Sequence, residues 1–211
     1  MGWPAIRSGQ DVVLSAPTGS GKTLAAFLVT LDELLRTSSE TSPRVHTIYV
    51  SPLRALGHDI HRTLQQPLAE LASLARERGR PWPGIEAGVR TADTPARQRR
   101  AMARRPPHIL VTTPESFFLM LLSPATRPAL LRASRVIVDE VHALAPSKRG
   151  VLLALSLELR DLLAGARAQR VGLSATIEPP EAAAVWLGGA HAGVERVIEG
   201  GGRKPLTLEG I

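Results

Sequence analysis

The stretch Leu14 to Thr23, "LSAPTGSGKT", decides the fold class of this chain of 211 residues. An apolar run leads into it, small residues occupy positions 19 to 21, and a second apolar run follows at once. This order is typical of a strand, a tight turn and a helix. Four residues separate Ala16 from Gly21-Lys22-Thr23, which is the spacing of a phosphate-binding loop with Ala where the simplest pattern has Gly. An ordinary glycine-rich turn is the alternative, and the flanking strand and helix favour the phosphate-binding loop.

Short apolar runs alternate with helical stretches along the rest of the chain. We expect strands at residues 11–15, 46–51, 85–90, 108–113, 135–140, 169–174 and 194–199. Helices are expected over Lys22–Arg36, Leu53–Glu77, Pro95–Arg105, Pro114–Leu122, Gly150–Leu163 and Pro180–Leu187. The alternation predicts an α/β fold, a three-layer domain with a mostly parallel sheet flanked by helices. Such sheets bind ligands at the carboxyl ends of their strands.

The fifth of these helices carries leucines at three- and four-residue spacing: Leu152, Leu155, Leu159 and Leu162. We predict that they form one apolar stripe facing the core, with Glu158, Arg160 and Asp161 off it.

The run "VIVDEVH" ends an apolar strand with two adjacent acids, Asp139 and Glu140. A buried parallel strand would deliver them to the sheet edge that carries the phosphate loop. There Asp139 can hold Mg²⁺ and Glu140 can polarise the attacking water. Such a pair alone would more often lie in a solvated loop, whereas an upstream phosphate loop makes ATP hydrolysis the better interpretation. The predicted ATP and Mg²⁺ site consists of Ala16, Pro17, Thr18, Gly19, Ser20, Gly21, Lys22, Thr23 and Asp139, with Thr23 and Asp139 as metal ligands.

The composition limits the classes of protein that remain. The chain has no cysteine, which excludes disulfides, thiolate metal sites and a cysteine nucleophile and fits a cytoplasmic protein. No run approaches the roughly 18 apolar residues of a membrane span, so we expect no membrane partner. The formal charge is +7, and only Lys22, Lys148 and Lys204 of the 26 basic residues are lysines. Arginine suits bidentate phosphate contacts, although a coding bias toward arginine explains the charge equally well.

The motifs together resemble a known family. "APTGSGKT", the DEVH box Asp139-Glu140-Val141-His142 and "GLSAT" at 172–176 resemble motifs I, II and III of superfamily two helicases, in that order. "SPLRALGHDI" (51–60), "RTADTP" (90–95), "TTPES" (112–116) and "KRG" (148–150) extend the likeness, with Ala92 where the second of these segments usually has Gly. The combination resembles the large helicase-related (Lhr) family of DNA-repair helicases. Ski-type RNA helicases share the DEVH-like box but fit "SPLRAL" and "TTPES" less well.

The resemblance implies an N-terminal RecA-like ATP-binding domain over residues 1–199. It further implies a linker at 200–211 toward a second RecA-like domain, which supplies the remaining phosphate-binding groups. The family translocates 3′ to 5′ on single-stranded DNA, so we expect single-stranded DNA or an RNA–DNA hybrid as partner. By position, the resemblance makes Lys22, Asp139, Glu140 and His142 catalytic and assigns Ser174 and Thr176 to coupling. A nucleic-acid-binding fragment with a vestigial nucleotide site remains an alternative.

The expected nucleic-acid contacts fall at strand ends or in the turns that follow them: Pro52, Arg54, Arg90, Thr112, Thr113 and Arg149. In the family these segments hold one strand by its phosphates, so sequence preference should be weak. Arg90 and Arg149 could instead be surface charges or structural ion pairs. The arginine-rich helix over Pro95–Arg105 could contact phosphates, although a solvated helix face is the more frequent outcome.

Overall fold

The computed structural model of the chain describes residues 2–17, 19–37, 44–52, 56–175, 180–190 and 196–199. Side chains are described within these ranges except at 2, 56–63, 180–181 and 196–199. The predicted linker at 200–211 lies outside the described residues.

In the described part of the chain, seven strands form one sheet in the order β3-β4-β2-β5-β6-β1-β7, and every neighbouring pair is parallel. The strands are β1 (Val12–Ser15), β2 (Thr47–Val50), β3 (Ala87–Arg90), β4 (Ile109–Thr112), β5 (Arg135–Val138), β6 (Gln169–Ser174) and β7 (Arg196–Glu199). Each lies within one of the runs expected from sequence. The prediction of a parallel α/β sheet is therefore confirmed.

The helices are α1 (Gly2–Arg7), α2 (Lys22–Arg36), α3 (Leu56–Glu77), α4 (Ala96–Arg104), α5 (Pro114–Leu122), α6 (Arg127–Leu131), α7 (Val141–Leu144), α8 (Lys148–Ala164) and α9 (Pro180–Gly188). The six long helices match the expected ones to within a few residues. The short helices α1, α6 and α7 are not expected from sequence, because four to six residues are too few to show a helical period. None of the described helices is both long and apolar enough to cross a membrane.

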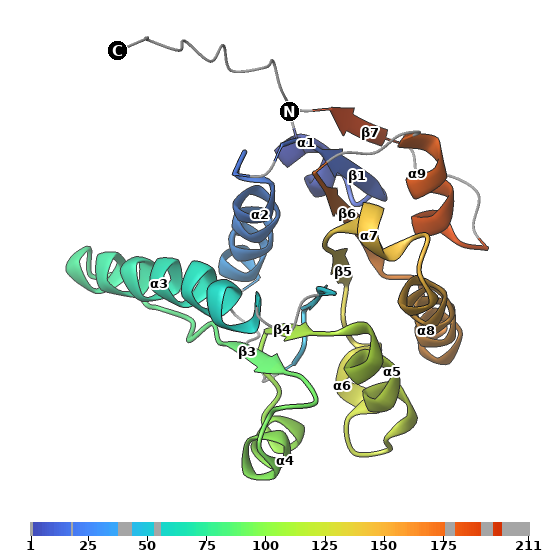
Figure 1. The fold of residues 1–211 in the computed structure, drawn as a ribbon. Coiled ribbons are helices and arrows are strands. Elements are labelled where there is room, and N and C mark those ends of the chain that lie inside the picture. Colours follow the sequence, from blue (N-terminus) through green and yellow to red (C-terminus); the bar gives the residue numbers. More distant parts are fainter. Residues whose placement is uncertain are drawn as a thin grey trace, which may run out of the picture.

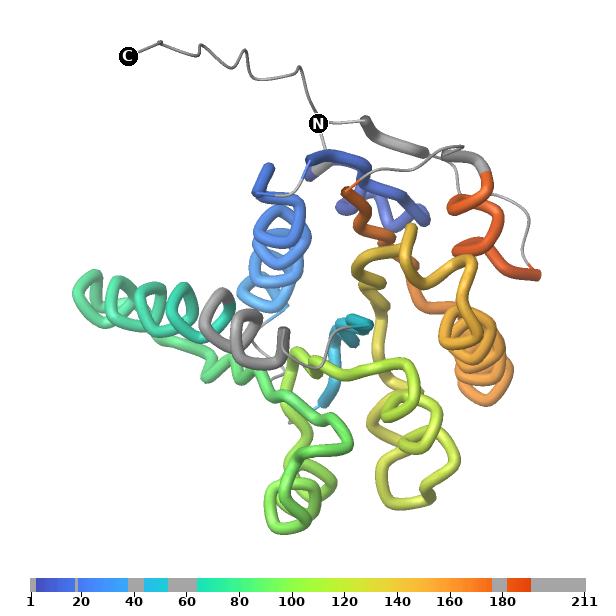
Figure 2. Tube along the Cα trace, in the orientation of Figure 1, coloured from blue at the N-terminus to red at the C-terminus, as the bar shows by residue number. Residues whose placement is uncertain are grey.

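Helices pack on both faces of the sheet, which gives three layers with one hydrophobic cluster on each face of the sheet. Helices α1, α2 and α3 cover one face, where Phe27 and Leu64 pack against the strands. Helices α5 to α9 cover the other, where Phe117 and Leu153 belong to the second cluster. Figures 1 and 2 show α2 and α3 on one side of the sheet and α5, α6, α8 and α9 on the other. Helices cover both faces of the sheet, which is why the strand sequences are continuous apolar runs.

The predicted leucine stripe of α8 is wrong. Leu155 and Leu162 are 63% and 79% exposed, whereas Arg160 and Asp161 are 2% and 9% exposed. The buried face of α8 instead carries Leu153 and Leu157, and Arg160 lies one turn further along it. Hydrophobic spacing failed here because the core-facing stripe ends in charged residues that find partners inside the protein.

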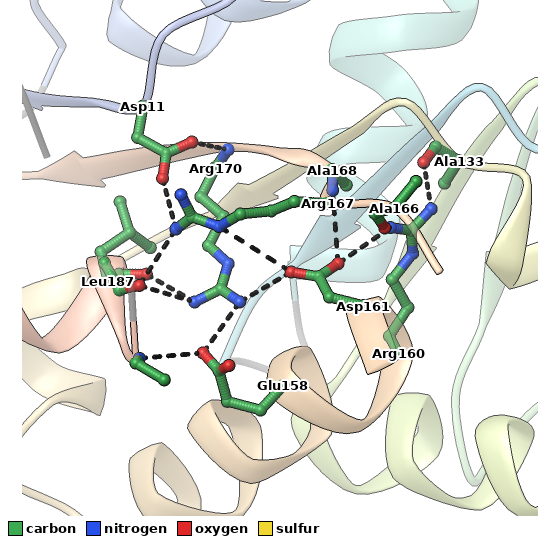
Figure 3. Close-up of polar contacts among 12 residues, drawn as sticks. Asp11, Ala133, Glu158, Arg160, Asp161, Ala166, Arg167, Ala168, Arg170 and Leu187 are labelled. Atoms are coloured by element: carbon green, nitrogen blue, oxygen red, sulfur yellow. Dashed lines mark hydrogen bonds and ion pairs between the residues drawn. The ribbon is translucent and has the colours of Figure 1, made fainter. Parts of the chain in front are cut away.

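Those partners form a buried polar network at the amino-terminal edge of the sheet (Figure 3). Arg170 of β6, 1% exposed, donates to Asp161 and Glu158 of α8 at 2.8 and 2.9 Å and to the Leu187 carbonyl of α9 at 2.9 Å. Asp11, just before β1, accepts from the Arg170 amide at 2.7 Å and pairs with Arg167 at 2.6 Å. The network ties β6, α8 and α9 together, because Arg170 donates to groups on both helices.

Candidate nucleotide and nucleic-acid site

The strand order places the phosphate loop and the acidic pair on either side of one strand. Strand β6 lies between β1 and β5, with Ser15 opposite Ser174 and Val138 opposite Gly172. Because all three strands are parallel, the loop after β1, the acids after β5 and the end of β6 lie at the same edge. This is the edge where α/β sheets bind ligands.

The phosphate loop turns through two glycines in left-handed backbone. Gly19 has φ 80° and Gly21 has φ 84°, a region that side chains with a Cβ rarely enter. The Ser20 amide donates to the Pro17 carbonyl at 3.1 Å, and the Ala16 amide donates to the Ser174 carbonyl at 3.1 Å. Gly21 occupies the N-cap of α2, so the first amides of this helix are free of a side-chain cap of its own. An uncapped helix N-terminus behind a glycine turn suits an anion.

Lys22, the first residue of α2, bonds to the loop that precedes it. Its ammonium group donates to the carbonyl of Ala16 and, at 2.9 Å, to that of Pro17. Burial lowers the pKa of Lys22, while Glu140 and Asp139 raise it. The lysine is therefore within electrostatic reach of both acids that follow β5.

Asp139 is 7% exposed, and both of its carboxylate oxygens are held. Its Oδ1 accepts from the Glu140 amide at 2.9 Å, and its Oδ2 accepts from the Tyr49 hydroxyl at 2.5 Å. Burial raises the pKa of Asp139, and these two hydrogen bonds together with Lys22 act in the opposite direction. The carboxylate has one orientation, fixed from two sides.

Glu140 is the one described residue other than glycine with a positive φ, at 51°. It is the N-cap of α7, and its carboxylate lies 3.4 Å from Nε2 of His142. On the other side of the imidazole, Nδ1 is 2.9 Å from the Ser174 hydroxyl. His142 thus connects Glu140 to the end of β6.

Tyr49 is the residue of this site that the sequence analysis missed. It is fully buried in β2, and its ring stacks on Phe27 of α2 at a centroid distance of 5.0 Å. Its hydroxyl contacts Thr23 as well as Asp139. A signal existed: the chain has one tyrosine, and it falls inside an apolar strand where a phenol needs a polar partner.

Arg149 has partners within the chain. Its guanidinium donates to both oxygens of Glu115, at 2.5 and 3.0 Å, and to the Pro52 carbonyl at 2.6 Å. The hydrogen bond from Arg149 holds the pKa of Glu115 below its ordinary value. This geometry favours the structural ion pair that the sequence left open for Arg149. The next residue, Gly150, lies so close to α7 that a Cβ would meet the Leu144 carbonyl oxygen at 1.9 Å.

The hydroxyls of the two threonines at the end of β4 also form hydrogen bonds within the chain. Thr112 donates to the Arg90 carbonyl at 2.7 Å, and Thr113 caps α5 by accepting from the Ser116 amide at 3.4 Å. Both threonines are buried. Arg90 itself is half-buried, and its pKa is lowered by burial and by neighbouring Arg99. Within the described part of the chain, Arg90 has no acidic partner.

Three of the predicted site residues, Thr18, Arg54 and Thr176, lie outside the described residues. The arginine-rich helix α4 buries none of its residues, as expected for a solvated face. Arg105, just after α4, pairs with Glu86 at 2.9 Å on the surface.

Comparison with known proteins decides the family. Residues 1–185 match the family model described as DEAD/DEAH box helicase. The chain belongs to the DEAD/DEAH box helicase family. This helicase domain is 53% identical over 187 residues to the "Lhr helicase/ probable uracil glycosylase" of Mycolicibacterium smegmatis, covering 89% of the chain and 12% of that protein. It is 46% identical over 209 residues to the "ATP-dependent helicase Lhr-Core" of Sulfolobus acidocaldarius, covering 98% of the chain and 23% of that protein.

Among solved structures, the helicase domain matches that of Mycobacterium smegmatis helicase Lhr bound to ssDNA and AMP-PNP, with a TM-score of 0.83 and 49% identity. That match covers 93% of this chain and 24% of the other. The resemblance to Lhr helicases and the RecA-like fold are thus confirmed. The helicase domain spans between about an eighth and a quarter of the length of these relatives.

Proposed function

We propose that this chain is the ATP-binding and ATP-hydrolysing motor domain of an Lhr-like helicase that moves along single-stranded DNA. One observation carries the proposal. The loop that holds Lys22 and the acids Asp139 and Glu140 flank β6 at one sheet edge, with the lysine close enough for both acids to raise its pKa. A lysine, a glycine turn and two acids in this arrangement are what phosphoryl transfer to water requires.

The donors at this edge fit Mg²⁺ and a nucleoside triphosphate. The Thr23 hydroxyl and the Asp139 carboxylate are hard oxygen ligands of the class that Mg²⁺ binds. When bound, the ion neutralises charge on the phosphate oxygens. Lys22 exchanges its bonds to the Ala16 and Pro17 carbonyls for phosphate oxygens, which costs little because those bonds only anchor its own loop.

Glu140 is the group that orients the attacking water and takes its proton. Its backbone is left-handed, and its carboxylate lies 3.4 Å from Nε2 of His142. The hydrogen bond between His142 and Ser174 then links the hydrolytic group to the end of β6. A change at the nucleotide is thereby passed to the neighbouring strand end.

Nucleic acid would lie across the carboxyl ends of β3, β4 and β2. Arg90 supplies a guanidinium at this rim, and the segments of Pro52 and of Thr112 with Thr113 supply backbone groups. The threonine hydroxyls already hydrogen-bond within the chain. Main-chain amides near the threonines would therefore contact the phosphates of the nucleic acid, and such contacts do not depend on the base. The similar Lhr structure is bound to ssDNA and AMP-PNP, which supports both classes of ligand for this chain.

A second RecA-like domain completes the cleft in this proposal. The Lhr relatives are four or more times longer than the matched region, which leaves room for such a domain. The chain alone should therefore bind Mg-ATP weakly and hydrolyse it slowly. The 3′-to-5′ direction, a role in DNA repair and a cytoplasmic location are part of the same proposal, by likeness to the family.

The test is nucleotide binding and hydrolysis by residues 1–211, with and without single-stranded DNA. We expect binding of a fluorescent ATP analogue that Lys22→Ala weakens, and slow hydrolysis that Glu140→Gln abolishes while binding persists. Surface substitution Arg36→Met is the matched control and should change neither. No binding by the wild-type chain, or equal binding by Lys22→Ala, would reject the proposal in favour of a module with a vestigial nucleotide site.

The nucleic acid is tested in the longer enzyme. Single-stranded DNA should stimulate hydrolysis more than RNA or an RNA–DNA hybrid of the same length. Stronger stimulation by RNA would support a Ski-type RNA helicase instead.

A further inference from the structure

Tyr49 is an unusual residue for its position. It lies in β2 between Ile48 and Val50, all three fully buried, and β2 pairs with β5, the strand that ends at the acids. Its neighbours on the strand face the opposite hydrophobic cluster, whereas Tyr49 points to the face covered by α2. An aliphatic residue would fill this position without bringing a hydroxyl into the core. The phenol therefore needs an explanation from its partners.

Those partners are the two predicted metal ligands. The Tyr49 hydroxyl donates to Asp139 Oδ2 at 2.5 Å. The Thr23 side chain lies close enough to Tyr49 to lower the pKa of its hydroxyl. Thr23 follows the phosphate loop on α2, and Asp139 follows β5, so one buried side chain touches both halves of the nucleotide site. The ring is held in place by its stack on Phe27, four residues after Thr23 on the same helix.

The Tyr49 hydroxyl restricts the rotation of the Asp139 carboxylate. The Glu140 amide holds only Oδ1, about which the carboxylate can still rotate. The bond from Tyr49 to Oδ2 fixes the second oxygen and with it the plane of the group. Thr23 also lowers the pKa of Tyr49, which places its side chain close to the same hydroxyl.

We propose that Tyr49 is a positioning residue for Mg²⁺, which orients the Asp139 carboxylate and the Thr23 hydroxyl so that the metal binds with the nucleotide. The inference rests on the proposed function, since it concerns the metal of that site. It separates two properties: nucleotide contacts through the loop do not depend on Tyr49, whereas metal binding does. Loss of such an outer partner typically weakens metal binding by about 10- to 100-fold.

The first experiment is a Mg²⁺ titration of nucleotide binding by Tyr49→Phe, which keeps the ring and removes the hydroxyl. Affinity for a fluorescent ATP analogue in EDTA should match that of the wild type to within about twofold. The Mg²⁺ concentration for half-maximal tightening should rise by about tenfold. The control Ser156→Ala removes another fully buried hydroxyl, which bonds to the Leu152 carbonyl within α8, and should leave the titration unchanged.

An unchanged or lower Mg²⁺ requirement in Tyr49→Phe would overturn the inference while leaving the proposed function intact. A wild-type chain whose nucleotide binding ignores Mg²⁺ would instead defeat the proposed function itself. The two failures are distinguishable because the first is seen only in the variant.

A second experiment needs no substitution and so does not depend on how the variant folds. Tyr49 is the one tyrosine in the sequence, so 3-fluorotyrosine labelling gives a single ¹⁹F resonance from this site. The resonance should shift when Mg²⁺ is added to the nucleotide-bound chain, and much less when nucleotide is added in EDTA. A resonance that does not respond to Mg²⁺ would contradict the proposed positioning role.

Discussion

At the scale of single residues, backbone strain lies at Glu140, the residue that we propose orients the attacking water. Glu140 is the described non-glycine residue with a positive φ, and such a backbone conformation costs about 1 to 3 kcal/mol. It also follows a buried aspartate, so two carboxylates stand side by side. The strained residue is the N-cap of α7, and its carboxylate is near enough to Lys22 to raise the pKa of the lysine.

We predict that Glu140→Gly stabilises the chain while abolishing hydrolysis. Glycine enters the left-handed region without a Cβ clash, so the free energy of unfolding should rise by about 1 kcal/mol relative to Glu140→Gln. Urea denaturation of the two variants measures the difference, and both should lack ATP hydrolysis. A Glu140→Gly variant less stable than Glu140→Gln would show that the turn is not strained.

At the scale of secondary-structure elements, α8 packs on the sheet through buried charged residues as well as through leucines. Its buried face ends in Arg160 and Asp161, and Arg160 donates to the carbonyls of Leu131 and Ala133 at the end of α6 and just beyond it. Asp161 meets Arg170 of β6 (Figure 3). Removing one member of such a network leaves the others buried and unpaired, which costs more than the pair itself contributes.

Arg170→Met should therefore lower the free energy of unfolding by about 3 kcal/mol. The substitution leaves Asp161 with fewer donors and frees the terminal carbonyls of α9. The matched control is Arg36→Met, which breaks the exposed pair with Asp32 on α2 and should cost less than about 0.5 kcal/mol. Urea denaturation reports both, and equal small losses would mean that the network contributes little.

At the scale of the whole molecule, two histidines at the amino-terminal edge of the sheet, one half-buried and one buried, couple stability to pH. Burial is the largest cause that lowers the pKa of His46, to about 4 from 6.5, with Arg135 adding to it and Glu33 opposing it. Burial also lowers the pKa of His108, whose carbonyl accepts from the His46 amide at 2.8 Å. As pH falls below 6.5, the unfolded chain takes up these protons and the folded chain does not. Stability is therefore present above pH 6.5 and lost as pH falls toward 4.

We expect the shifted pKa of His46 to lower the free energy of unfolding by about 3 kcal/mol as pH falls from 6.5 to 4. Asp11 and Asp139, whose pKa values are raised by burial, act in the opposite direction at the acidic end. Comparing wild type with His46→Gln by urea denaturation at several pH values isolates the histidine. The variant should show a shallower loss with falling pH, and parallel curves would contradict the assignment.

Much of this molecule followed from local pattern. The glycine turn before Lys22, the apolar strand that ends in Asp139 and the alternation of strands with helices were enough to predict the fold class. They also predicted the sheet edge at which Lys22 and Asp139 lie. They suffice because each is a short-range device: a turn that needs left-handed backbone, and strands whose burial on both faces requires continuous apolar residues. The end of β6 was placed correctly for the same reason.

Tertiary packing decided which polar groups meet. Whether Arg149 faces solvent or Glu115, whether Arg160 is buried, and whether Tyr49 reaches Asp139 depend on side chains or carbonyls 34, 27 and 90 residues away in sequence, respectively. Analysis of hydrophobic spacing predicts that a charged residue is exposed and that a tyrosine in a strand only packs in the core. It cannot predict a hydrogen-bond partner that folding brings in from another element. The amino acid order thus specifies the strands, the helices and the glycine turn before Lys22, while only the folded sheet determines which buried hydroxyl or guanidinium holds them in position.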